Sequence, residues 1–497
     1  MKKTALPVLL STALLSACGG SDSNHGPTAP RYSWQIIQLH TLKESDVKKG
    51  CVIYATAEND PSRVITASVA NSGYNILFHH GDGSIIEELT IPAIDVPNNG
   101  IVTINSALVP DEGYVSLEEI DSGLSGNPDV YMFSMAKSLL SDQLLNVRSA
   151  QTNSDCYKGK DYRKQTDIED NTAVSVLQES GVEYYQSSYG LDRVAGRDIS
   201  AHIPVLAPLP AQRDTLITAY YSKQDQQLSD LAYYGFVEPS YLYNSQQAPE
   251  ITAATLSNQG LIPMYWQAAA NLSLDQGSAI VAMHDQQSYL WQPLYQHIDQ
   301  FTIAPEYAEV SHWSALFAGE SNDSHWRFQT AMSIDTEDSQ LVLALPELSS
   351  MEYSDILQDC PLVQGQAKHC IDNDASFEAT DFALQRTQVR LINSSNRAFY
   401  QSIYAEPKAQ QPLLQSSAIE LSIREVERLE IALIDAELNA TQQQYFMAKY
   451  MNSRSIAETG QVQAFSDANG VIIDPEQQQT LYLDMLKHSA SIVQQAK

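Results

Sequence analysis

Short runs of β-branched and aromatic residues recur along most of this 497-residue chain, and they limit what it can fold into. Between Tyr32 and Cys156 such runs follow one another at intervals of roughly 8–15 residues, with turn residues between them. They include residues 51–57, 74–80, 101–104 and 114–118. We therefore predict a mainly β fold in which residues 32–160 form a β-sandwich.

The clearest local pattern in this region is a pair of strand-like runs around Gly81-Asp82-Gly83. Residues 74–80 and 84–91 flank these turn residues, which predicts a β-hairpin. With its turn of the form x-D-G-x, the segment 73–120 resembles the small β-sandwich modules of the carboxypeptidase-regulatory-like and Ig-like kinds. The resemblance implies an Ig-like sandwich and no activity. Apolar residues at helical spacing in 130–147 predict a short helix.

A charged, polar stretch at 158–172 indicates a domain boundary. Strand-like runs continue beyond it, and we predict β-rich regions at 171–350 and 351–497, at roughly 150 residues per domain. The sequence leaves open whether these two regions form one domain. The run 426–434 fits a strand and a helix about equally well.

The end of the chain has a helical pattern. Asp474-Pro475-Glu476 combines an N-cap residue with proline at the first helical position. Apolar residues follow at helical spacing, at Leu481, Met485 and Ile492. We therefore predict a C-terminal helix.

The first residues have the parts of a secretory signal peptide: Lys2 and Lys3, a short apolar run, and small residues before Cys18. Leu15-Ser16-Ala17-Cys18 is similar to the bacterial lipobox, whose cysteine is acylated after the chain is cut before it. The resemblance implies a Gram-negative lipoprotein with a signal peptide at 1–17 and a membrane anchor on Cys18. An ordinary signal peptide with a chance cysteine is the alternative.

Gly19 follows the lipobox, where an aspartate would retain a lipoprotein at the inner membrane. The resemblance therefore implies the outer membrane, on a face that the sequence does not specify. Residues 18–31 have no apolar period and are interpreted as a flexible tether. We expect no transmembrane segment, because no later run reaches the roughly 20 apolar residues that a bilayer requires.

Four cysteines remain once Cys18 is assigned to lipid, and an even number in an oxidising compartment predicts disulfides. We predict the pairs Cys51–Cys156 and Cys360–Cys370, because each lies within one region of the chain. A zinc site is the competing interpretation, although the spacing lacks paired CxxC or CxxH elements.

The formal net charge of −31 repels phosphates, which excludes nucleic acid as a partner. Solubility in a salty medium explains such a charge, and a cationic partner or bound Ca²⁺ is the alternative. Residues 372–381 have the alternating oxygen ligands of a calcium loop without the glycine of an EF-hand, and the candidates are Asp372, Asp374, Glu378 and Asp381. A solvated acidic loop is the simpler interpretation, so we expect no other metal or cofactor.

Two further groups of residues have side chains that suit a binding site. His79-His80 with Asp82 has metal-binding side chains, but neighbouring residues of a strand face opposite ways, which favours a plain turn. Trp266, Trp291, His312-Trp313 and His325-Trp326 predict either core packing or a glycan-binding face.

The common catalytic motifs, such as G-x-S-x-G, H-E-x-x-H and the P-loop, do not occur. We therefore expect a non-catalytic lipoprotein that binds or scaffolds at the cell envelope, with a protein or polysaccharide partner. An envelope hydrolase of glycan or peptide is a second hypothesis, and a carbohydrate-binding surface protein is a third.

Overall fold

The computed structural model describes residues 29–57, 60–121, 129–147, 152–158, 172–189, 192–205, 213–224, 227–246, 252–268, 271–338, 340–344, 348–349, 357–360, 369–373, 377–434 and 491–495. Within them the fold is mainly β, as predicted. The helices of these residues are 3-10 turns at Glu44–Asp46, Glu87–Leu89, Ala93–Asp95, Ser106–Leu108, Lys137–Leu139, Pro239–Tyr241 and Ala379–Asp381. In the described part of the chain, none is long and apolar enough to cross a bilayer.

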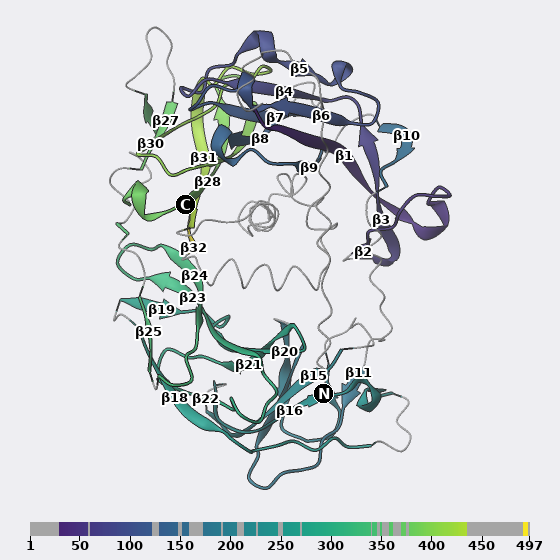
Figure 1. Ribbon diagram of the computed structural model, residues 1–497, viewed down its shortest axis with the longest axis vertical. Coiled ribbons are helices and arrows are strands. Elements are labelled where there is room, and N and C mark those ends of the chain that lie inside the picture. The colour runs from purple at the N-terminus through teal and green to yellow at the C-terminus, as the bar shows by residue number, and fades with distance from the viewer. Residues whose placement is uncertain are drawn as a thin grey trace, which may run out of the picture.

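One sheet of 13 strands runs through the molecule and forms its frame (Figure 1). Its order is β21 (Gln287–Pro293), β20 (Ala279–His284), β23 (His312–Ser321), β24 (Arg327–Ser333), β32 (Ser491–Gln495), β31 (Ile423–Ile434), β28 (Leu384–Asn393), β29 (Ala398–Ala405), β8 (Asp129–Ala136), β7 (Tyr114–Asp121), β4 (Tyr74–His79) and β5 (Ile91–Pro92), with β19 (Leu272–Leu274) paired to β23. The ambiguous run 426–434 is therefore strand.

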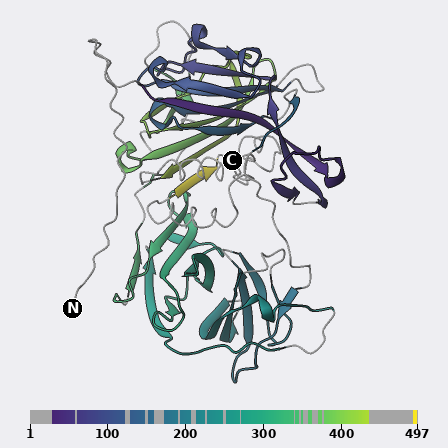
Figure 2. The same cartoon turned by 45° about the vertical axis from the view of Figure 1, so that its right-hand side comes forward.

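The frame sheet joins distant parts of the sequence. β8 pairs in parallel with β29, from Val130 opposite Phe399 to Met135 opposite Tyr404. In both views the purple N-terminal strands lie beside the green C-terminal strands, and the teal strands form the other half (Figures 1 and 2). The sheet thus contains strands from all three predicted regions. The boundaries between those regions stay a prediction.

Along β8 the frame sheet is buried on both of its faces. Val130 and Met132 face one core cluster, while Tyr131, Phe133 and Met135 face the other. A strand buried on both faces is apolar throughout, and its sequence then resembles a buried helix. For this reason the predicted helix at 130–147 was wrong: the segment is β8, a 3-10 turn and β9.

A six-stranded sheet packs on the N-terminal part of the frame sheet and completes a sandwich. Its order is β10 (Thr152–Cys156), β3 (Asp60–Ala70), β1 (Arg31–Lys43) and β6 (Ile101–Asn105), with β2 (Ala55–Ala57) on β3 and β9 (Gln143–Asn146) on β1. Trp34 of β1 meets Phe133 of β8 edge-on, with ring centroids 6.0 Å apart. This buried layer is the core of the predicted N-terminal sandwich.

The turn at Gly81-Asp82-Gly83 is present, and the chain after it returns antiparallel to β4, but the second strand is much shorter than predicted. β4 pairs over its whole length with β7, whereas on its other edge residues 84–92 contribute a bridge between Ile85 and His79, a 3-10 turn at Glu87–Leu89 and the two-residue β5, whose Ile91 pairs with Ile76. Ile85-Ile86 and Glu87-Glu88 are pairs of like residues, so this run has no period of two and cannot offer one apolar face.

Four smaller sheets complete the structure. Their orders are β13 (Asp192–Arg197), β12 (Tyr184–Tyr189), β15 (Thr215–Gln224) and β16 (Gln227–Val237); β14 (Ile203–Pro204), β11 (Thr172–Val174) and β17 (Tyr243–Asn244); β22 (Gln300–Ile303), β18 (Ile262–Ala268) and β25 (Gln340–Leu343); and β26 (Leu357–Asp359), β27 (His369–Asp372) and β30 (Gln410–Pro412). The first two enclose a core of their own, centred on Val174, Tyr185 and Ile217.

The predicted C-terminal helix does not extend to Ser491–Gln495, which form β32; residues 474–490 lie outside the described part. β32 pairs antiparallel with both β24 and β31, in the middle of the frame sheet. Backbone N–H and C=O groups of those two strands need partners, and satisfying them outweighs the local preference of Ile492 for a helical stripe.

Candidate functional site

Both predicted disulfides are present with the predicted pairing. Cys51 bonds Cys156, 105 residues apart in sequence, and Cys360 bonds Cys370, 10 residues apart. The first closes the N-terminal sandwich between the segment before β2 and the end of β10. Cys18 and the tether up to residue 28 lie outside the described residues, so the lipid anchor stays a prediction.

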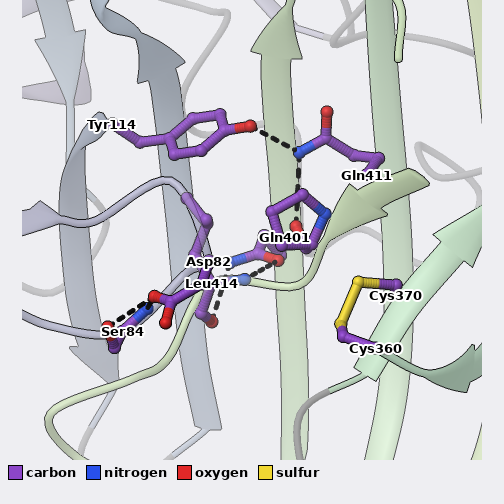
Figure 3. Close-up of a disulfide and its surroundings, with 9 residues drawn as sticks. Asp82, Ser84, Tyr114, Cys360, Cys370, Gln401, Gln411 and Leu414 are labelled. Atoms are coloured by element: carbon purple, nitrogen blue, oxygen red, sulfur yellow. Dashed lines mark hydrogen bonds between the residues drawn. A yellow bond between two sulfur atoms is a disulfide. The ribbon is translucent and has the colours of Figure 1, made fainter. Parts of the chain in front are cut away.

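The Cys360–Cys370 disulfide lies beside the segment that connects β30 to the frame sheet (Figure 3). Gln411 of β30 donates from Nε2 to the hydroxyl of Tyr114, at 3.2 Å. The amide of Leu414 donates to Oε1 of Gln401 at 3.1 Å, and Nε2 of Gln401 donates to the carbonyl of Leu414 at 3.1 Å. This disulfide therefore belongs to a small sheet held against the frame by buried hydrogen bonds.

His79 and His80 do not converge on a metal. His80 is exposed, whereas His79 is fully buried with both ring nitrogens engaged. Nδ1 lies 3.3 Å from the carbonyl oxygen of Gly83 and Nε2 lies 2.9 Å from the Ser116 hydroxyl. A carbonyl only accepts, so the proton is on Nδ1 and Ser116 donates to Nε2. Asp82 accepts from Ser84 in the turn itself.

We expect His79 to make the fold sensitive to acid. Burial lowers its pKa from 6.5 to about 4. The unfolded chain therefore takes up the proton first, and stability falls by about 3 kcal/mol as the pH drops from about 6.5 to about 4. His79→Gln should be less stable at neutral pH but lose less on acidification. Urea unfolding of both proteins across this range measures the difference, since the carboxylates titrate in both. Identical pH slopes would contradict this role.

The calcium candidates are only partly described. Asp372 is half-buried at the end of β27, Glu378 and Asp381 are exposed at a 3-10 turn, and Asp374 lies outside the described residues. Asp372, Glu378 and Asp381 do not form a group whose oxygens all lie within 4.8 Å of one another. The calcium loop stays a prediction that depends on Asp374.

The tryptophans singled out from the sequence are core residues. Trp266, Trp291, Trp313 and Trp326 are all buried. Three of them donate their indole N–H to a backbone carbonyl, from Trp266 to Ile298, from Trp291 to Thr302 and from Trp326 to Ser349. The prediction of a glycan-binding face built from these tryptophans is therefore wrong, and the core-packing interpretation is confirmed.

The strand that buries Trp266 presents a different face to solvent. β18 alternates, with Met264 and Trp266 buried and Pro263, Tyr265 and Gln267 exposed. Its neighbours in the same sheet are β22 and β25, which are labelled beside it in Figure 1. Both strands alternate in the same sense. We call the outward side chains of these three strands the β18 face: Pro263, Tyr265, Gln267, Gln300, Thr302, Gln340 and Val342. None of these seven is charged, in a chain whose net charge is −31.

The strand registers arrange the β18 face around one aromatic ring. Tyr265 stands opposite Gln300 on one side and Gln340 on the other. Gln340 also donates from Nε2 to Oε1 of Gln267 at 3.1 Å, which links these two amides. Tyr265 is 45% exposed and Val342 56%. The face thus offers one ring, amide groups that both donate and accept, and no charge.

The sequence carries a local signal for the exposed ring of this face. Successive side chains of a strand point to opposite faces of the sheet. In the run Pro263-Met264-Tyr265-Trp266-Gln267, placing Trp266 in the core therefore places Tyr265 in solvent. The pairing of Tyr265 with Gln300 and Gln340 depends on register and has no local signal.

In comparisons with known proteins, the chain matches no family model, no curated protein and no solved structure.

Proposed function

We propose that this protein is a lipid-anchored, non-catalytic binding protein of the bacterial outer membrane, held by acyl chains on Cys18. Its ligand in this proposal is a neutral polysaccharide of the envelope. The lipobox and signal peptide support the anchor, and two disulfides suit an oxidising compartment.

The observation that carries the ligand class is the absence of charge on the β18 face. A charged polymer would need counter-charges on the face that binds it, and none of the seven side chains of the β18 face carries a charge. A neutral sugar polymer needs a flat aromatic ring against which a sugar can stack and amides for its hydroxyls, and Tyr265 between Gln300 and Gln340 supplies both. A protein partner would call for a larger cluster of exposed apolar side chains than Tyr265 and Val342 provide.

The test uses the purified lipoprotein in detergent and a panel of soluble neutral polysaccharides, with dextran, a β-glucan and a galactomannan as probes. Affinity electrophoresis should show retardation by at least one of them. Tyr265→Ala should weaken that binding roughly three- to tenfold, the equivalent of about 0.5–1.5 kcal/mol for a stacked ring. Tyr221→Ala is the matched control, because Tyr221 on β15 is also 45% exposed.

Equal binding by wild type and Tyr265→Ala would contradict the proposal, as would an equal loss in the Tyr221 control. A photo-crosslinker at position 265 that captured an envelope protein instead of glycan would favour the scaffold hypothesis.

A further inference from the structure

One cluster of metal-ligating side chains stands out in the described part of the chain. Asp214, His284 and Asp285 each offer one ligand atom, and these atoms all lie within 4.8 Å of one another. Asp214 immediately precedes β15, His284 ends β20, and Asp285 begins the turn between β20 and β21. The cluster therefore lies between the frame sheet and the sheet that contains β15, far in sequence from the predicted calcium loop.

His284 is held in a ligating orientation. Its ring is buried, with 6% of the residue exposed, and stacks on Phe236 with centroids 3.8 Å apart and planes 10° apart. Nδ1 lies 3.1 Å from the carbonyl oxygen of Glu309, which can only accept, so Nδ1 carries a proton. Metal-binding histidines commonly fix their tautomer through such a bond from the other nitrogen.

The remaining ring nitrogen faces the two carboxylates. Nε2 of His284 lies 3.5 Å from Oδ2 of Asp214 and 3.7 Å from Oδ2 of Asp285. Ligands of a tetrahedral ion with bonds of about 2.0–2.1 Å stand about 3.3 Å apart, so the two distances from Nε2 exceed this spacing by only a few tenths of an ångström, and the two carboxylate oxygens lie within 4.8 Å of each other.

The backbone supports both carboxylates. The Tyr289 hydroxyl donates to the backbone carbonyl of Asp214 at 3.0 Å, which anchors the residue before β15. Asp285 and Gln286 have φ values of 46° and 64°, the left-handed pair of a two-residue hairpin turn. This turn keeps the Asp285 carboxylate beside the His284 ring although its side chain is 88% exposed.

We propose that Asp214, His284 and Asp285 bind a zinc ion, with a fourth position open to water. One imidazole nitrogen and two carboxylate oxygens suit a first-row transition metal, whereas Ca²⁺ takes six to eight oxygens. The bound ion would link the β20–β21 hairpin to the start of β15. The proposal is independent of the β18 face.

The experiment treats the full lipoprotein in detergent with a chelator and titrates it with Zn²⁺ alone, by calorimetry and thermal unfolding. One equivalent should bind and raise the melting temperature. Asp285→Asn should weaken binding at least about tenfold while keeping the turn, because asparagine also adopts left-handed φ. His284→Asn should abolish it. His325→Asn is the control, since the ring of His325 faces a single carboxylate, that of Glu320, at 3.2 Å.

Several outcomes would overturn the site. They are Zn²⁺ uptake unchanged in Asp285→Asn, no uptake by the wild type beyond that of the His284 variant, or displacement of Zn²⁺ by an equal concentration of Ca²⁺. Substitution with Co²⁺ adds a geometric readout: strong visible absorption supports a tetrahedral site, and weak octahedral bands contradict it.

Discussion

Replacing Arg386 alone with methionine is expected to lower the free energy of unfolding by about 3–5 kcal/mol. Arg386 of β28 donates from Nη2 to Oε1 of Glu430 on the adjacent strand β31, and both side chains are fully buried. The single substitution leaves the Glu430 carboxylate in a low-dielectric core without its counter-charge. Urea unfolding followed by circular dichroism measures the loss.

The double variant Arg386→Met/Glu430→Leu should recover most of that loss, because it removes both charges and keeps apolar volume in the core. Arg327→Met is the surface control: its pair with Asp275 at 2.6 Å is about half exposed, and we expect less than about 1 kcal/mol. If the double variant were as unstable as the single one, packing and not the unpaired charge would explain the effect.

Removing the Cys51–Cys156 disulfide with a pair of alanines is expected to cost about 4.8 kcal/mol, and removing Cys360–Cys370 about 2.8 kcal/mol. The difference follows from loop length: the bonds close loops of 105 and 10 residues, and the longer loop restricts the unfolded chain more. Melting temperatures and urea midpoints of the two double variants test the ranking.

Dithiothreitol treatment of the wild type should reproduce the variant that lacks all four cysteines. A larger loss from Cys360→Ala/Cys370→Ala than from Cys51→Ala/Cys156→Ala would show that native contacts around the small sheet, rather than loop entropy, dominate.

Both candidate sites combine residues that are close in sequence with residues that only the fold brings near them. Alternation in β18 was sufficient to expose Tyr265 opposite Trp266, but its glutamine neighbours come from strands about 35 and 75 residues further along the chain. Likewise Asp285 and His284 are adjacent, yet Asp214 reaches them only through the packing of β15 near β21. No spacing rule relates such residues, because their distance in space is set by sheet order.

The sequence by itself predicted the mainly β class, some strand positions such as those of β4, β6 and β7, and both disulfide pairs, because strand-forming runs, turn residues and cysteine number are local or countable properties. Only the tertiary structure decided that β8 is a strand and not a helix, that β4 pairs with β7, and that Ser491–Gln495 complete the middle of the frame sheet. In each case the deciding term is the pairing of backbone N–H and C=O groups with a distant strand. That pairing stabilises the strand more than local propensity favours its alternative, and it does not exist until the sheet has formed.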